Sequence, residues 1–230
     1  MSEIAAPPAV QPRPQYDFLR PLTFVFEDPR WLPKLLLGAL FSLAGIILIG
    51  IFFVYGYLAR LVRNVVAGEQ TPLPEWDDLG EMFSEGAMLF VATLIYTAPF
   101  FFLFFLMFPF SMLADMDNAA AQFLGGGGLV VLGLVFVPFA LALAVWVPAA
   151  MLHAIVKRDF RAAFDFRTIG LFLRGNALNY LLAYLDWLVA RFAAGFGILL
   201  CCVGIFITSF WALAVAGAAF AQVYRLSENK

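Results

Sequence analysis

The chain has 230 residues, of which 63% are hydrophobic and only 13% are charged, whereas soluble domains carry about 25% charged residues. This composition excludes an ordinary water-soluble domain, and a net charge of −2 offers no basic excess for binding nucleic acid. The apolar residues fall in long blocks, which predict an all-α polytopic membrane helix bundle. We expect about five hydrophobic segments, arranged as two hairpins plus a first span or re-entrant segment.

The ends of the chain differ in composition from its middle. Residues 1–15 are rich in Ser, Ala and Pro and lack the basic and apolar regions of a secretory signal, so they are predicted to form a disordered tail. Residues 16–34 are expected to form an interfacial segment. Residues 35–225 are expected to form a single transmembrane domain, followed by a short tail at residues 226–230.

The first apolar block, Leu35 to Leu58, contains no charge. As one helix it would be about 36 Å long, enough to cross a hydrocarbon core of about 30 Å. The alternative is a re-entrant hairpin that bends near Gly45 to Gly50, with arms of only about twelve residues. Length favours a single crossing. Charge favours the hairpin and an internal amino terminus, because the hairpin keeps the basic residues that precede the block on the inner side: Arg13, Arg20, Arg30 and Lys34.

Two further apolar blocks, Gly86 to Ala114 and Leu129 to Val156, are expected to form a helical hairpin. The turn is predicted at Asp115 to Gly128, because its four consecutive glycines disfavour a helix. The last apolar stretch, Asn176 to Tyr224, is too long for one span. It predicts a second hairpin that turns near Gly195 and Gly197.

The distribution of lysine and arginine predicts the orientation in the membrane. Both hairpin turns and Arg191 are expected to face outward, and the remaining basic residues near span ends are expected to be cytoplasmic. This pattern is typical of a multi-pass protein of the cytoplasmic (inner) membrane with a cytoplasmic carboxyl terminus. The nine residues are Arg60, Arg63, Lys157, Arg158, Arg161, Arg167, Arg174, Arg225 and Lys230.

Ionisable groups inside a span are costly, so each one is a candidate site. Asp186 lies within the last apolar stretch, and Asn179 falls on the same helical face, with Asn176 nearby and Arg191 five residues beyond. These four residues are a candidate intramembrane polar site for binding or proton transfer. The alternative is a carboxylate that is hydrogen-bonded between helices, with Arg191 extended to lipid headgroups.

Prolines interrupt both helices of the first hairpin, at Pro99, Pro109, Pro138 and Pro148. Proline frees a backbone carbonyl, and broken helices line substrate paths in transporters. A small transporter or channel-like protein is therefore an admissible function. Against it, the first two blocks contain no charge that could relay protons or ions.

The segment from Lys157 to Arg174 alternates basic residues with phenylalanines, which favours a helix lying at the membrane surface. We also expect the acidic run from Glu75 to Glu85 to face this segment. The candidate contacts with lipid headgroups are Lys157, Arg158, Arg161, Arg167 and Arg174.

No nucleotide-binding loop, acyl-transfer triad or pair of carboxylates is recognisable, so we expect no enzyme activity and no cofactor. His153 has no neighbouring metal ligands, and the adjacent Cys201 and Cys202 point to different helix faces. The expected partners are membrane lipids and another membrane protein or a second copy, without nucleic acid. Small residues that would suit self-association are Gly204, Ala214, Gly217 and Ala218.

A motif string covers roughly the first ninety residues. It begins with Phe26 to Trp31, continues with Gly56-Tyr57-Leu58-Ala59-Arg60, Arg63 and Gly68-Glu69, and ends with Leu73 to Asp78, Phe83 and Gly86. This string resembles a family of small prokaryotic multi-span membrane proteins of unknown function. The resemblance implies an integral membrane protein and brings no reaction, substrate or cofactor.

The same string has a physical interpretation. Tyr57, Trp31 and Trp76 are expected to belong to aromatic belts near a membrane surface, with Arg60 and Arg63 among the headgroups. Together these observations predict a structural, assembly or accessory component that acts through helix and lipid contacts.

Overall fold

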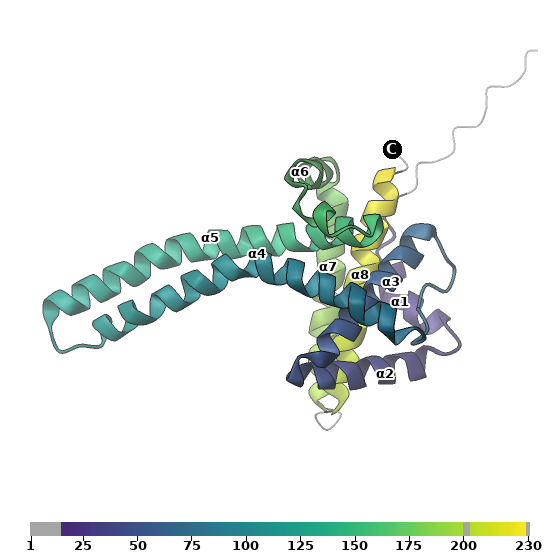
Figure 1. The fold of residues 1–230 in the computed structure, drawn as a ribbon, viewed down its shortest axis with the longest axis horizontal. Coiled ribbons are helices and arrows are strands. Elements are labelled where there is room, and N and C mark those ends of the chain that lie inside the picture. Colours follow the sequence, from purple (N-terminus) through teal and green to yellow (C-terminus); the bar gives the residue numbers. More distant parts are fainter. Residues whose placement is uncertain (1–14, 200–202, 229–230) are drawn as a thin grey trace, which may run out of the picture.

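The computed structural model describes residues 15–199 and 203–228, which form helices and no strand. The predicted tail up to Pro14, together with Cys201, Cys202 and Lys230, lies outside these residues. The helices are α1 (Arg20–Glu27), α2 (Trp31–Ala44), η1 (Gly45–Ile47), α3 (Ile49–Ala67), α4 (Leu79–Ala114), α5 (Ala119–Lys157), η2 (Phe160–Phe164), α6 (Phe166–Gly175), α7 (Ala177–Gly195), η3 (Phe196–Leu199) and α8 (Val203–Glu228). Figure 1 shows their arrangement.

Five helical stretches within the described residues are long and apolar enough to cross a membrane, which confirms the predicted number of segments. They comprise α3, α4, α5, α7 with η3, and α8. Helices α7 and α8 form the second hairpin, and α7 ends at Gly195 as expected. The short helix α1 meets α2 at a bend of 108°.

The first apolar block is not one helix. It breaks at Gly45–Ile47, and Leu48 adopts a left-handed conformation with φ 67° before α3 begins. Helix α3 then folds back along α2, so that the rings of Phe41 and Phe53 lie 4.7 Å apart. The block therefore does not form the single helix that one crossing would need: it bends near Gly45, as the hairpin alternative expects, although α3 by itself is long and apolar enough to cross. The basic residues on both sides of the block consequently contact one loop, residues 68–78.

Helices α4 and α5 form the predicted first hairpin, but the turn is shorter than expected. Helix α5 begins at Ala119 and continues through the four glycines, so the prediction of a turn up to Gly128 is wrong. A β-carbon at Gly125 would lie 2.3 Å from the backbone nitrogen of Ala114, and one at Gly128 would lie 2.0 Å from the ring of Phe110. Close packing of the two helices thus offsets the low helix propensity of glycine.

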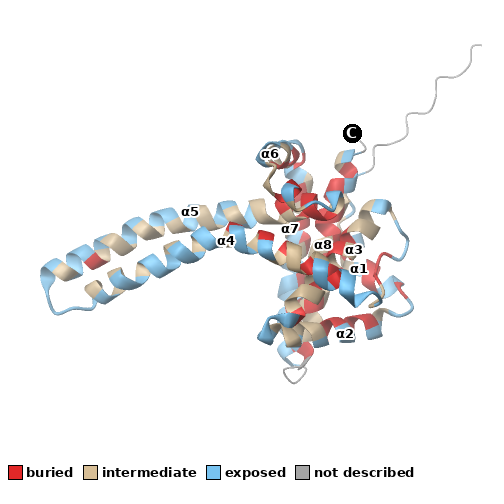
Figure 2. Cartoon of the chain, viewed as in Figure 1, coloured by how far each residue is buried: buried red, intermediate tan, exposed pale blue. Residues whose placement is uncertain are grey.

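The distal part of this hairpin, residues 99–143, projects away from the other helices (Figure 1); we call it the arm. Figure 2 shows that its residues are exposed or half-buried, and Gly125 is the only buried residue between positions 97 and 148. Its only charges, Asp115 and Asp117, stand at the tip. The arm therefore has a polar tip on an apolar stem.

The remaining helices share a core that includes aromatic residues expected at a membrane surface. Tyr57 is fully buried and stacks on Trp76, with ring centroids 4.3 Å apart, and Phe210 packs against both. The loop before α4 folds over α3, so Tyr57 packs inside the core rather than at a lipid-facing surface, and Trp76 is half-buried against it. Ala214 and Ala218 are likewise buried against this cluster, so they offer no surface for self-association.

Candidate functional site

The four polar residues of the candidate intramembrane site do not form one cluster. Asp186 is fully buried, and the hydroxyl of Tyr16 donates to its Oδ2. Asn176 donates instead to the carbonyl of Phe172, over 3.0 Å, and the exposed Arg191 lies 3.5 Å from the hydroxyl of Ser209. Asn179 is half-buried.

The contact between Tyr16 and Asp186 matches the alternative of a carboxylate hydrogen-bonded within the bundle, although the donor comes from the amino-terminal segment. Sequence reasoning missed Tyr16, because no pattern places it beside α7. Burial, reinforced by the neighbouring Asp186, raises the pKa of Tyr16 well above its usual value. The hydroxyl therefore stays protonated and serves as a donor. The second carboxylate oxygen, Oδ1, has no hydrogen-bond partner among the described residues.

Substitution of Tyr16 by phenylalanine should destabilise the fold by about 1–3 kcal/mol, because it leaves a buried carboxylate without its donor. Adding Asp186→Asn should restore part of this loss, since the amide carries no charge. Thermal unfolding in detergent of the single variants and the double variant measures this coupling. Additive losses would show that the two side chains do not interact.

One of the carbonyls freed by proline already has a donor. Pro148 lacks an N–H, which leaves the carbonyl of Ala144, four residues earlier, without its helical partner. The hydroxyl of Tyr184 from α7 donates to this carbonyl, and that of Tyr180 donates to the carbonyl of Val145 over 2.8 Å. These two hydrogen bonds join α5 to α7, and the carbonyl of Ala144 is not available to coordinate cargo.

An apolar groove of about 630 Å³ lies where the arm joins the other helices. Helices α3, α4, α5, α7 and α8 line it, with Phe100 and Ala140 at the base of the arm. The hydroxyls of its two threonines form hydrogen bonds to their own helix: Thr93 donates to the carbonyl of Leu89 and Thr97 to that of Thr93, each over 2.9 Å. Because the lining is almost entirely apolar and both threonine hydroxyls are engaged, the groove suits an apolar occupant.

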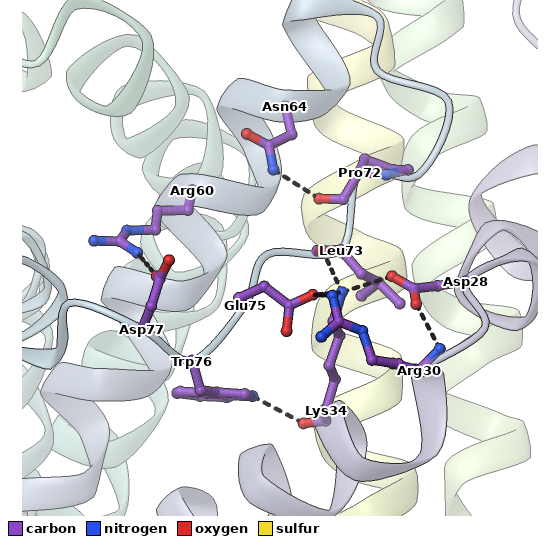
Figure 3. A network of polar contacts seen from close by, with 10 residues as sticks. All are labelled: Asp28, Arg30, Lys34, Arg60, Asn64, Pro72, Leu73, Glu75, Trp76 and Asp77. Atoms are coloured by element: carbon purple, nitrogen blue, oxygen red, sulfur yellow. Dashed lines mark hydrogen bonds and ion pairs between the residues drawn. The ribbon is translucent and has the colours of Figure 1, made fainter.

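A buried lysine joins the corner between α1 and α2 to the loop before α4 (Figure 3). The ammonium of Lys34 contacts Oδ2 of Asp28 at 2.6 Å, Oε1 of Glu75 at 2.7 Å and the carbonyl of Leu73 at 2.8 Å. The indole of Trp76 donates to the carbonyl of Lys34 over 3.0 Å. All three ammonium protons thus have acceptors, which is what a buried lysine requires.

The acidic run from Glu75 to Glu85, in the loop before α4 and the first turns of α4, pairs mainly with arginines of α3. Arg60 lies 2.6 Å from Asp77 and 2.7 Å from Glu81, and Arg63 lies 2.7 Å from Glu85. The expectation that this run faces the segment Lys157–Arg174 is therefore largely wrong. Helix α3 is the direct neighbour of α4, so its arginines reach these carboxylates first. Among the described residues, Arg158 is the one member of the later segment that pairs with this run, at 3.7 Å from Glu81.

The five basic residues proposed to contact headgroups all lie on the surface, around η2 and α6. Arg158 is the only one in an ion pair within residues 15–199 and 203–228. The structure thus places Lys157, Arg158, Arg161, Arg167 and Arg174 on one continuous segment at the junction of α5 and α7.

No group of three potential metal ligands occurs within the part of the chain that the structure describes. His153 is buried between the rings of Phe172 and Tyr224, and its Nδ1 lies 2.9 Å from the carbonyl of Ala149. It packs as a core residue rather than at the membrane interface.

Comparison with known proteins yields one match. A family model described as a protein of unknown function (DUF4013) matches residues 39–224. No curated protein and no solved structure matches the chain. The matched range begins in α2 and ends in α8, so it includes the first hairpin, the groove and α6.

Proposed function

The chain belongs to the DUF4013 family of proteins of unknown function, and we propose its role from its physical features. We propose that it is a structural, assembly or accessory component of the cytoplasmic membrane that acts through helix and lipid contacts. The carboxyl terminus and the basic ends of the helices lie on the cytoplasmic side in this proposal, following the excess of lysine and arginine there.

The arm is the observation that carries the proposal. Residues 99–114 form a helix about 24 Å long, and residues 119–143 form one about 37 Å long. The first is somewhat shorter and the second somewhat longer than a hydrocarbon core of about 30 Å. Phe102, Phe105 and Phe108 are each at least 65% exposed within the chain. So large an apolar surface must be covered by acyl chains or by helices of a partner.

The groove at the base of the arm supports the same function. Its lining is apolar and its threonine hydroxyls are engaged, whereas a transport path for ions or polar cargo needs free donors, acceptors or charges. The groove is therefore suited to holding an apolar chain next to the arm.

Purification of the full chain in nanodiscs formed directly from cell membranes tests the proposed role. We expect a defined membrane protein to accompany the chain, and we expect Asp186→Asn to leave this association unchanged. If no protein accompanies the chain, and if reconstituted vesicles show a solute flux that Asp186→Asn abolishes, the protein is a transporter and the proposal is wrong.

A pair of variants locates the contact surface. Replacing Phe102 and Phe105 of the arm, each 68% exposed, by alanine should abolish co-purification of the partner while the chain remains monodisperse. The matched control replaces Phe192 and Leu199, which are 74% and 75% exposed beyond the arm, by alanine. Retention of the partner by both variants would exclude the arm as its binding surface.

A further inference from the structure

Helix α6 lies where the chain passes from one span to the next. Helix α5 ends at Lys157 and α7 begins at Ala177, and both are long and apolar enough to cross a membrane. As the connection between two candidate spans, η2 and α6 would lie at a membrane surface. In Figure 1, α6 is seen nearly end-on above α7, so it lies across the end of that helix.

The outer face of α6 alternates cations with an apolar side chain. Arg167, Leu171 and Arg174 are spaced by four and three residues and so share one face. All three are exposed, Leu171 to 62%. The opposite face buries Ile169 and Phe172. An exposed leucine between two arginines is costly in water and favourable at the boundary between headgroups and acyl chains.

The charge around α6 is positive and mostly unpaired. Residues 157–175 contain five cations and two carboxylates, a net charge of +3. Both carboxylates cap backbone N–H groups: Asp159 accepts from Arg161 over 2.9 Å, and Asp165 accepts from Thr168 over 3.0 Å. Hydrogen bonds from Thr168 hold the pKa of Asp165 below its usual value. Among the described residues, neither carboxylate forms an ion pair with Arg167 or Arg174.

We propose that this surface, formed by α6 with Lys157, Arg158 and Arg161, binds the phosphate groups of anionic phospholipids. Leu171 inserts beside the headgroups, while the arginines contact the phosphates. The apolar side chain between the two arginines selects a lipid surface over a soluble anion. The inference rests on the proposed function and specifies the class of lipid.

Titration of the full chain in an uncharged detergent tests this binding. The probe is dioctanoyl phosphatidylglycerol, compared with dioctanoyl phosphatidylcholine and with inorganic phosphate, by calorimetry. We expect the anionic lipid to bind more tightly than either comparison ligand and to weaken as salt is raised. The variant Arg167→Gln with Arg174→Gln should lose about fivefold in affinity for each cation removed.

Two control variants separate lipid binding from a structural role of α6. Arg167→Lys with Arg174→Lys keeps the charge and should retain affinity for phosphatidylglycerol. Arg20→Gln removes a positive charge elsewhere and should also retain it. If the glutamine variant does not fold, the salt dependence of phosphatidylglycerol binding by the wild type still tests whether the cations bind the lipid.

The proposal is overturned if phosphatidylglycerol binds no better than phosphatidylcholine, or if inorganic phosphate binds as tightly as the lipid. It is also overturned if salt or the glutamine substitutions leave the affinity unchanged. These outcomes are independent of the co-purification experiment. If the chain shows no preference for anionic lipid but a partner protein still co-purifies with it, this inference is wrong and the proposed function stands.

Discussion

Substitution of Gly86 by alanine is expected to destabilise the fold by about 3 kcal/mol, because α3 and α4 cross with their backbones in contact. A β-carbon at Gly86 would lie 1.7 Å from the carbonyl oxygen of Phe52. Facing it, a β-carbon at Gly56 would lie 2.0 Å from the carbonyl oxygen of Met82. The nearest atoms belong to rigid backbone, so the helices must separate to admit even one methyl group.

The arm offers a matched control for this substitution. Gly127 lies within α5, and a β-carbon there would meet nothing within 4 Å. Gly127→Ala should therefore stabilise the helix slightly, by up to about 1 kcal/mol, through the higher helix propensity of alanine. Thermal unfolding of the two variants in the same detergent compares them directly. Equal melting temperatures for Gly86→Ala and the wild type would show that the backbones of α3 and α4 are not in close contact at this crossing.

The crossing gives physical meaning to the motif string found in the sequence. Gly56 and Gly86 form the α3–α4 contact, Tyr57 stacks on Trp76, and Arg60 pairs with Asp77. The string therefore describes one structural junction between α2, α3, α4 and the loop before α4. Its residues are engaged with one another, which is consistent with an architectural role for this part of the chain.

Long-range contacts limited what the sequence could predict. The apolar blocks, the two hairpins and the end of α7 at Gly195 follow from local composition. The course of α5 through Gly125–Gly128 does not, because it depends on the approach of Ala114 and Phe110 from the other helix. In the same way, a carboxylate such as Glu85 is visible in the sequence, while its pairing with Arg63 depends on which helix is adjacent.

In the candidate site, too, some features follow from the local sequence and others depend on long-range contacts. The exposure of Arg167 and Arg174 follows from the amphipathic pattern of their helix. The partner of Asp186 does not follow from any pattern, because Tyr16 reaches it from 170 residues away in the chain. Polar residues inside spans are therefore poor guides to a site until their tertiary partners are known.

Replacement of Lys34 by methionine is expected to destabilise the fold by about 3–5 kcal/mol, because it removes the cation from a buried ion pair. Lys34 and Asp28 are each about 5% exposed, and Glu75 and the carbonyl of Leu73 complete the set of acceptors. Methionine matches the length of the lysine stem, so loss of packing is small. The main cost is a buried carboxylate left without its counter-ion.

The pH dependence of this loss identifies its origin. Burial alone would raise the pKa of Asp28, but hydrogen bonds from Lys34 and from the backbone of Arg30, with the charge of Lys34, lower it below its usual value. A carboxyl whose pKa is lowered by folding stabilises the fold fully above its unfolded pKa of about 3.9, and this contribution is lost as pH falls through the folded pKa. The wild type should therefore lose stability in that acidic range, whereas Lys34→Met should lose much less.

The double variant Lys34→Met with Asp28→Asn completes the test. Removing both charges should recover much of the stability that Lys34→Met loses, since the buried carboxylate is gone. Thermal unfolding in detergent at neutral pH and at about pH 3.5 measures both effects. If the single variant is as stable as the wild type at neutral pH, the ammonium contacts of Lys34 do not hold the α1–α2 corner against the loop before α4. Other contacts then hold that corner, such as the packing of Phe24 and Val25 and the hydrogen bond from Trp76 to the carbonyl of residue 34.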